Sequence, residues 1–307
     1  MDKERLFFYT LPLFFLLIPI CIGLAIVSGL LSIPLAIFFL IVLDLILAIF
    51  ASSCYYKQLY KGGLADIILS SEFLDVNLQF FLYHLFTLIP FIISLKARSP
   101  TEVVILVLIA TTSLVFLSFR FPVGFFTKLE PLSYSLPYKV YLARFKRIKE
   151  GNAMICGILK PRIILFSPLF EFLNEEEIKG IIAHEMGHIL NRDHIKALFS
   201  LMISIIGIEL IALSLYYNFV MKEERIGSLF LSAGMLLSLL SSGFLLINRR
   251  MELKADLYAS HVVGKDVYIS ALRKLSEHDL LPLDWGSETH PSIKERIENV
   301  LKEDYSS

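Results

Sequence analysis

The chain has 307 residues, of which 56% are hydrophobic and only 19% are charged, and its mean hydropathy is +0.67. A soluble domain of this length needs more polar surface, so the composition predicts an integral membrane protein that contacts lipid. The 29 basic and 29 acidic side chains cancel, which leaves no basic surface for nucleic acid. The cysteines (Cys21, Cys54 and Cys156) form no CxxC pair, so neither a disulfide framework nor a cysteine metal site is expected.

Six apolar runs are candidates for crossing a bilayer core of about 30 Å. They cover residues 6–30, 31–51, 73–95, 103–119, 197–220 and 226–247. The third run contains Asp75 and His84, so it is either a true span or an interfacial or re-entrant segment. Asp44 in the second run is another ionisable group at membrane depth, and such groups often line a polar path.

The basic residues that flank these runs are distributed unevenly between the two sides. With the N-terminus in the cytoplasm, nine of them fall inside and four outside. This asymmetry follows the positive-inside tendency. It predicts a multi-pass protein of the cell membrane whose polar segments, 126–196 and 249–307, face the cytoplasm.

The segment between the fourth and fifth runs is charged and amphipathic. Two short strands are expected at residues 153–159 and 162–166, separated by a turn at Lys160–Pro161. Asn174 then has the position of a helix N-cap, with Glu177 three residues later at the capping-box position. The helix that begins there is expected to continue to about Leu190.

This helix contains the sequence His184-Glu185-Met186-Gly187-His188, an HExxH motif. Residues four apart share one helix face, so both imidazoles can bind the same ion. Neutral imidazoles suit Zn²⁺, one ion per chain, and Glu185 is placed to take a proton from a metal-bound water. The alternative is a pair of solvated helix histidines beside a surface glutamate. His194, His261 and His278 have no partner at ligand spacing and are interpreted as structural or solvated.

A third protein ligand is available after the sixth run. Glu252 and Asp256 are four residues apart, so Glu252 could bind the ion while Asp256 holds the second ring nitrogen of a histidine ligand. The alternative is an ordinary charged helix that follows a membrane span. Exactly two apolar runs separate His188 from Glu252, so both return to the same side of the membrane, which favours a shared metal site.

These features together resemble the HtpX and CAAX prenyl protease family of integral-membrane metalloproteases, over roughly residues 130 to 300. The resemblance rests on Asn152-Ala153, on the stretch from Leu173 that ends in AHEMGH, on RRMELKAD from Arg249, and on the element from Thr289 to Ile297. It implies a mainly α membrane protein with about six transmembrane helices and a zincin-like catalytic domain, which combines the HExxH helix with a short β-sheet.

The resemblance also implies roles for individual residues. Glu252 is expected to be the third zinc ligand and Glu185 the general base, while His290 stabilises the oxyanion with support from Arg296. The strand that begins at Asn152 and Ala153 is expected to pair with extended protein or peptide substrates, which would be damaged or misassembled membrane proteins. His290 could instead be a helix-start residue before Pro291.

The chain then divides into four parts. Residues 1–125 form a membrane region, 126–196 a catalytic segment, 197–248 a two-span hairpin, and 249–307 the third-ligand helix with the rest of the catalytic domain.

Two departures from the family pattern leave alternatives open. Four apolar runs precede the HExxH helix where HtpX proteins typically have two, and Gly157–Leu165 with Asn191–Asp193 also resemble the antibiotic-sensing receptor metalloproteases. A regulatory protease of that kind is one alternative. A non-enzymatic polytopic transporter is the other, although it leaves the HExxH motif and the Glu252–Asp256 pair unexplained.

Overall fold

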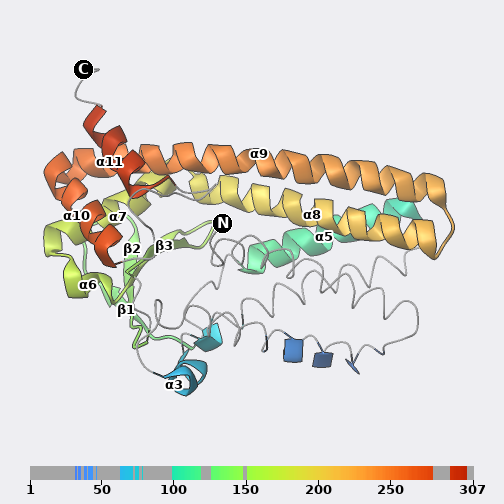
Figure 1. Cartoon of the computed structure of the whole chain (residues 1–307), viewed down its shortest axis with the longest axis horizontal. Coiled ribbons are helices and arrows are strands. Elements are labelled where there is room, and N and C mark those ends of the chain that lie inside the picture. Colours follow the sequence, from blue (N-terminus) through green and yellow to red (C-terminus); the bar gives the residue numbers. More distant parts are fainter. Residues whose placement is uncertain are drawn as a thin grey trace. The chain divides into compact units, whose positions relative to one another are not determined.

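The computed structural model describes residues 99–118, 126–147, 151–278 and 291–302, together with scattered residues at 32–46 and 63–78 (Figure 1). The described chain is mostly helical with one small sheet, as expected. It divides into two compact units. The apolar unit contains helix α5 (Pro100–Ser118) and residues 199–242, and the sheet unit contains residues 126–198 and 243–302.

The sheet has four strands in the order β1-β2-β4-β3. Their bounds are Leu129–Leu132 for β1, Lys139–Ala143 for β2, Ala153–Cys156 for β3 and Arg162–Phe166 for β4. Strand β4 pairs in parallel with β2 and antiparallel with β3, and β1 is antiparallel to β2. This order leaves β3 at one edge of the described sheet.

The strand expected at 162–166 is confirmed, but the one expected at 153–159 ends three residues early. The reason is Gly157, whose φ of +94° is a left-handed value that breaks the extended backbone. A Cβ at this position would lie 2.9 Å from the Lys160 carbonyl oxygen, so the turn also has no space for a side chain. Strands β1 and β2 were not predicted from the sequence.

The core of the sheet unit lies on both faces of β4. Ile163 and Leu165 pack with apolar residues of helix α7 (Glu175–Leu190), whereas Ile164 packs on the opposite face with Ala143 and Cys156. A strand that is covered on both faces is expected to be a continuous apolar run, and the sequence Ile-Ile-Leu meets that expectation. The sheet thereby gives α7 a fixed support.

Helix α7 begins as predicted. The Asn174 side chain accepts a hydrogen bond from the Glu177 N–H, and the Glu177 carboxylate accepts one from the Asn174 N–H. The same carboxylate also accepts hydrogen bonds from Ser270 and Lys274 of helix α10 (Lys265–His278). A capping residue therefore also joins two helices of the sheet unit. The short helix α6 (Leu169–Phe172) precedes α7 and packs against the same core.

Two helices are long and apolar enough to cross a membrane in the part of the chain that the structure describes: α8 (Asp193–Phe219) and the first part of α9 (Glu224–Val263). They correspond to the fifth and sixth runs. Helix α5 matches the fourth run, and the first three lie largely outside the described residues, so the expected count of six stays a prediction. Within the apolar unit, α8 and α9 cross closely at Gly207 and Gly234, where a Cβ would contact the opposite backbone.

Helix α9 is one continuous helix of 40 residues that runs from the sixth apolar run through the RRMELKAD segment to Val263 (Figure 1). Helix α11 (Ile293–Lys302) follows α10 in the described chain. A shorter helix, α3 (Leu64–Ile68), precedes Asp75.

The ionisable residues of the early apolar runs have different outcomes. Asp75 belongs to the sheet unit, where its buried carboxylate accepts hydrogen bonds from the N–H groups of Phe126 and Thr127, just before β1. It therefore anchors a loop of the sheet unit. Asp44 and His84 lie outside the described residues.

Candidate metal centre

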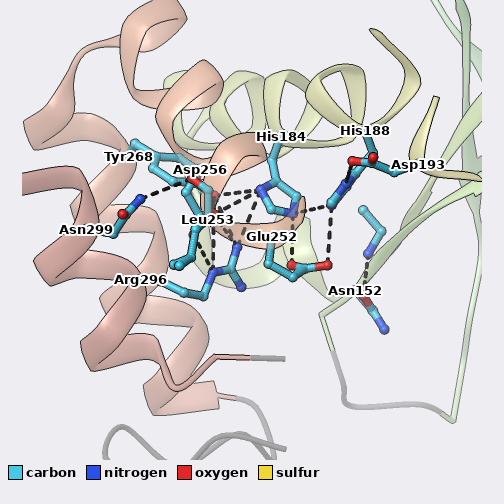
Figure 2. Close-up of polar contacts among 11 residues, drawn as sticks. Asn152, His184, His188, Asp193, Glu252, Leu253, Asp256, Tyr268, Arg296 and Asn299 are labelled. Atoms are coloured by element: carbon cyan, nitrogen blue, oxygen red, sulfur yellow. Dashed lines mark hydrogen bonds and ion pairs between the residues drawn. The ribbon is translucent and has the colours of Figure 1, made fainter. Parts of the chain in front are cut away.

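His184 and His188 project from one face of α7, as their spacing predicts (Figure 2). Their Nε2 atoms lie 3.2 Å apart, and both rings are largely buried. Between them in the sequence, Gly187 faces Ala255 of α9, and a Cβ at position 187 would lie 3.0 Å from the Ala255 Cα. The absence of a side chain at Gly187 lets α9 approach the helix that carries the histidines.

Glu252 of α9 completes a group of three potential ligands. Its Oε2 is 3.5 Å from His184 Nε2 and its Oε1 is 3.4 Å from His188 Nε2. Ligand atoms about 2.05 Å from an ion, in tetrahedral directions, lie about 3.3 Å apart. The three side chains thus fit a single Zn²⁺, and they are the metal-ligand cluster found among the described residues.

The other nitrogen of His184 faces a buried polar cluster. Its Nδ1 lies 3.0 Å from Asp256 Oδ1 and 3.0 Å from the Tyr268 hydroxyl (Figure 2). Asp256 is fully buried, and Arg296 of α11 donates to both of its oxygens, at 2.6 Å and 2.9 Å. A carboxylate can only accept, so Nδ1 of His184 carries the hydrogen and Nε2 is left for the metal. This contact is the one that the sequence suggested for Asp256.

His188 has a carboxylate of its own on the corresponding nitrogen. Its Nδ1 lies 3.0 Å from Asp193 Oδ2, while Lys196 donates to Asp193 Oδ1 at 2.7 Å. Asp193 reaches His188 across the short turn that follows the end of α7 at Leu190, in which Arg192 has a left-handed φ of +56°. From the sequence, Asp193 was only part of a family likeness, and its contact with His188 was not predicted.

Neighbouring carboxylates raise the pKa of both histidines. Burial alone would lower the pKa of His184, but hydrogen bonds to Asp256 and Glu252 outweigh it and raise the pKa above its usual value. Burial likewise opposes the shift at His188, where hydrogen bonds to Asp193 and Glu252 raise the pKa to about 10. A proton and a metal ion therefore compete for the same Nε2 atoms.

Glu185 lies on α7 between the two histidines in the sequence and is buried. Burial is the main reason that the pKa of its carboxyl is raised, and the neighbouring positive charge of His184 and His188 counteracts this. A carboxyl with a raised pKa beside a metal position can both take and return a proton.

Asn152 and Ala153 lie at the start of β3, at the edge of the sheet. The Asn152 carbonyl accepts from Phe166 N–H of β4, and its side chain accepts from Ala153 N–H (Figure 2). Strand β3 also contacts α7, the helix of the HExxH motif. The position therefore matches the strand expected to pair with substrate, although substrate pairing itself stays a prediction.

Helix α11 is held to α9 at three places. Arg249 donates twice to Glu295, Asn299 donates to the Leu253 carbonyl, and Arg296 contacts Asp256. Ser292 and Glu295 form a second capping box at the start of α11. His290 lies outside the described residues, so its expected role, and that of Arg296 in supporting it, stays a prediction.

Tyr268 was not predicted from the sequence as part of the site. This residue is 84 positions from His184 and belongs to another helix, so no local spacing indicates that they meet. The remaining described histidines, His194, His261 and His278, lie outside the ligand cluster. His194 is partly buried at the start of α8, His261 contacts its own helix at the Leu257 carbonyl, and His278 stacks on Phe172.

Comparison with known proteins gives matches at three levels. The sequence model of peptidase family M48 matches residues 132–304. A protease HtpX homologue from Caldanaerobacter subterraneus subsp. tengcongensis is 27% identical, over 53% of this chain and 72% of the relative. A protease HtpX homologue from Methylacidiphilum infernorum is 30% identical, and the match covers 42% of this chain and 47% of that protein. The chain thus matches only about half of the length of some relatives.

A solved structure shows the same fold over most of the chain. The crystal structure of S. mikatae Ste24p superposes with a TM-score of 0.58, covering 97% of this chain and 82% of Ste24p, at 18% identity. At that identity the likeness concerns the fold alone.

Proposed function

Because the chain belongs to peptidase family M48, we propose that it is a zinc-dependent endopeptidase embedded in a membrane. The observation that carries the proposal is the convergence of His184, His188 and Glu252 at tetrahedral ligand distances. Each histidine is fixed by a carboxylate on its other ring nitrogen, an arrangement that is typical of zinc sites. The three side chains would hold the ion and leave a fourth position open.

Bound zinc would lower the pKa of a coordinated water and polarise the scissile carbonyl. Glu185 would take a proton from the attacking water and return it to the leaving amine. Burial of Glu185 supports this role, because it raises the pKa of the carboxyl towards the range needed for proton exchange at neutral pH. His290 would donate a hydrogen bond to the developing oxyanion, with Arg296 in support.

An extended protein or peptide segment would bind along β3, at the edge of the described sheet beside Asn152 and Ala153, through backbone hydrogen bonds. Such pairing makes weak demands on the side chains of the substrate. It suits an enzyme of membrane-protein quality control, which must accept many damaged chains. The apolar helices α8 and α9 support a membrane location, and the charge asymmetry of the sequence supports a cytoplasmic site.

The test compares the full chain with its Glu185→Gln variant, both purified in detergent. We expect equal zinc content, near one ion per chain, and a loss of cleavage of an unstructured polypeptide by at least about a hundredfold. Glu176→Gln, an exposed glutamate on the same helix, is the matched control and should cleave normally.

A third variant tests the ligand set. Glu252→Ala should lose most of its bound zinc, because it removes one of three protein ligands. Equal cleavage by the wild type and Glu185→Gln, or full zinc occupancy in Glu252→Ala, contradicts the proposal. A regulatory protease would use the same site, and would differ in cleaving one specific membrane protein and sparing unstructured chains.

A further inference from the structure

Tyr268 occupies the point where four helices meet at the back of His184. Its hydroxyl donates to Asp256 of α9 at 2.6 Å and receives a hydrogen bond from Arg296 of α11 at 3.2 Å. The same oxygen lies 3.0 Å from Nδ1 of His184 on α7. The Tyr268 proton is directed to Asp256, because a carboxylate can only accept, so the hydroxyl oxygen is left to accept from His184.

The hydrogen on His184 Nδ1 is therefore shared between two acceptors at equal distance, Asp256 Oδ1 and Tyr268 Oη. A single acceptor allows an imidazole to rock about the hydrogen bond, whereas two acceptors fix its direction from two sides. The His184 and Tyr268 rings are nearly parallel, with an interplanar angle of 19° and ring centroids 6.4 Å apart.

The position of the Tyr268 ring depends on a glycine of α7. Gly180 is one turn before His184, and a Cβ there would lie 3.3 Å from the Tyr268 ring. The ring packs against α7 with no exposed surface and places its hydroxyl one turn further along, beside His184. If the Tyr268 hydroxyl only had to be satisfied by a hydrogen bond, Asp256 alone would be sufficient and the contact with His184 would not be needed.

We propose that Tyr268 is a positioning residue for the zinc ligand His184, and that Gly180 provides the space for it. The proposal rests on the zinc site of the proposed function. The Tyr268 hydroxyl holds the imidazole in the tautomer and orientation that present Nε2 to the metal. The removal of a group that orients a metal ligand costs about 10–100-fold in metal affinity.

The experiment uses the full chain in detergent and the variants Tyr268→Phe and Gly180→Ala. Zinc affinity is measured by competition with a chromophoric chelator, and the visible spectrum of the Co²⁺-loaded protein reports the ligand geometry. We expect Tyr268→Phe to raise the zinc dissociation constant about tenfold and to change the cobalt spectrum. Gly180→Ala keeps the hydroxyl but displaces the ring, so a smaller rise is expected. Tyr134→Phe, in the loop between β1 and β2, is the control and should match the wild type.

A purely structural role for Tyr268 would lower the melting temperature of the metal-free protein and leave the zinc dissociation constant and cobalt spectrum of the folded variant unchanged. That result overturns the inference while the proposed function stands. A wild-type protein that binds no zinc overturns the proposed function, and the inference with it. If Tyr268→Phe does not fold, Gly180→Ala decides: wild-type zinc affinity in that variant overturns the inference.

Discussion

Gly187 and Ala255 bring the helix that carries the two histidines into close contact with the helix that carries Glu252. A Cβ at position 187 would lie 3.0 Å from the Ala255 Cα and 3.3 Å from its Cβ. Because Ala255 is fully buried and the nearest atom belongs to the backbone, a side chain at 187 must displace α9 itself. The spacing of the proposed zinc ligands therefore depends on two small residues.

The first prediction follows from that contact. Gly187→Ala should weaken zinc binding by at least about tenfold, since Glu252 moves away from His184 and His188 together with α9. The measurement is a chelator competition on the folded protein. The matched control is Gly243→Ala, where a Cβ has no neighbour within 4 Å; this variant should bind zinc normally. Wild-type affinity in Gly187→Ala would show that α9 adjusts without moving Glu252.

Asp193 should prove as important for His188 as Asp256 is for His184. Asp193→Asn removes the charge that holds Nδ1 of His188 and should raise the zinc dissociation constant about 10–100-fold. Lys196→Met removes only the half-exposed partner of Asp193, so its effect should be smaller. The same chelator assay applies. Equal effects of the two substitutions would indicate that Lys196 and Asp193 act as one unit.

Zinc affinity and the stability of the metal-free protein should change with pH in opposite directions. The pKa of His188 is raised to about 10, so its contribution to the stability of the metal-free protein is complete below about pH 6.5 and is lost as the pH rises through 10. Zinc needs the neutral ring, so zinc affinity should increase over the same range. Thermal unfolding of the metal-free protein and zinc titrations from pH 6 to 9 test both. The result contradicts the prediction if zinc affinity is independent of pH.

Glu177 should contribute to stability without contributing to the chemistry. Glu177→Ala removes the capping box of α7 and the contacts with Ser270 and Lys274, so the free energy of unfolding should fall by about 1–3 kcal/mol. Chemical denaturation in detergent measures the change. The neighbouring Glu176→Ala removes an exposed pair with Lys179 and should cost less than about 1 kcal/mol. Zinc affinity of the folded variants should be unchanged.

The apolar unit contains a buried polar pair that can be tested separately. Thr111 of α5 donates to Glu209 Oε2 of α8 at 3.0 Å, and both side chains are almost fully buried among apolar residues. Thr111→Val leaves the carboxyl without this hydrogen bond and should destabilise the protein by about 1–3 kcal/mol. Thermal unfolding in detergent measures the loss.

Two controls accompany that experiment. Ser113→Ala, on the exposed side of α5, should have little effect, because its hydroxyl bonds only to the preceding helical turn. Glu209→Gln keeps an acceptor for Thr111 without a charge and should retain wild-type stability. A strong loss in Glu209→Gln would indicate that the carboxyl has to be ionised.

The sequence was sufficient for features that depend on neighbouring positions in the chain. Residues four apart share a helix face wherever the helix lies, so His184 and His188 were predictable as a pair, and Asn174 and Glu177 as a cap. The strand at 162–166 was predictable from its apolar run. Glu252 and Asp256 could be predicted as a pair because one helical turn separates them, and two apolar runs between His188 and Glu252 return the chain to the same side of the membrane.

Only the tertiary structure decided which side chains meet across elements. Tyr268 reaches His184 because α10 packs on α7 at Gly180, and Asp193 reaches His188 because a turn with a left-handed φ at Arg192 follows α7. Arg296 contacts Asp256 through the packing of α11 on α9. None of these contacts follows from a regular spacing along the sequence. Helix packing depends on small residues and buried hydrogen bonds that lie many positions apart. The sequence by itself therefore determined the metal-ligand motif, and the packing of four helices decided how each histidine is held.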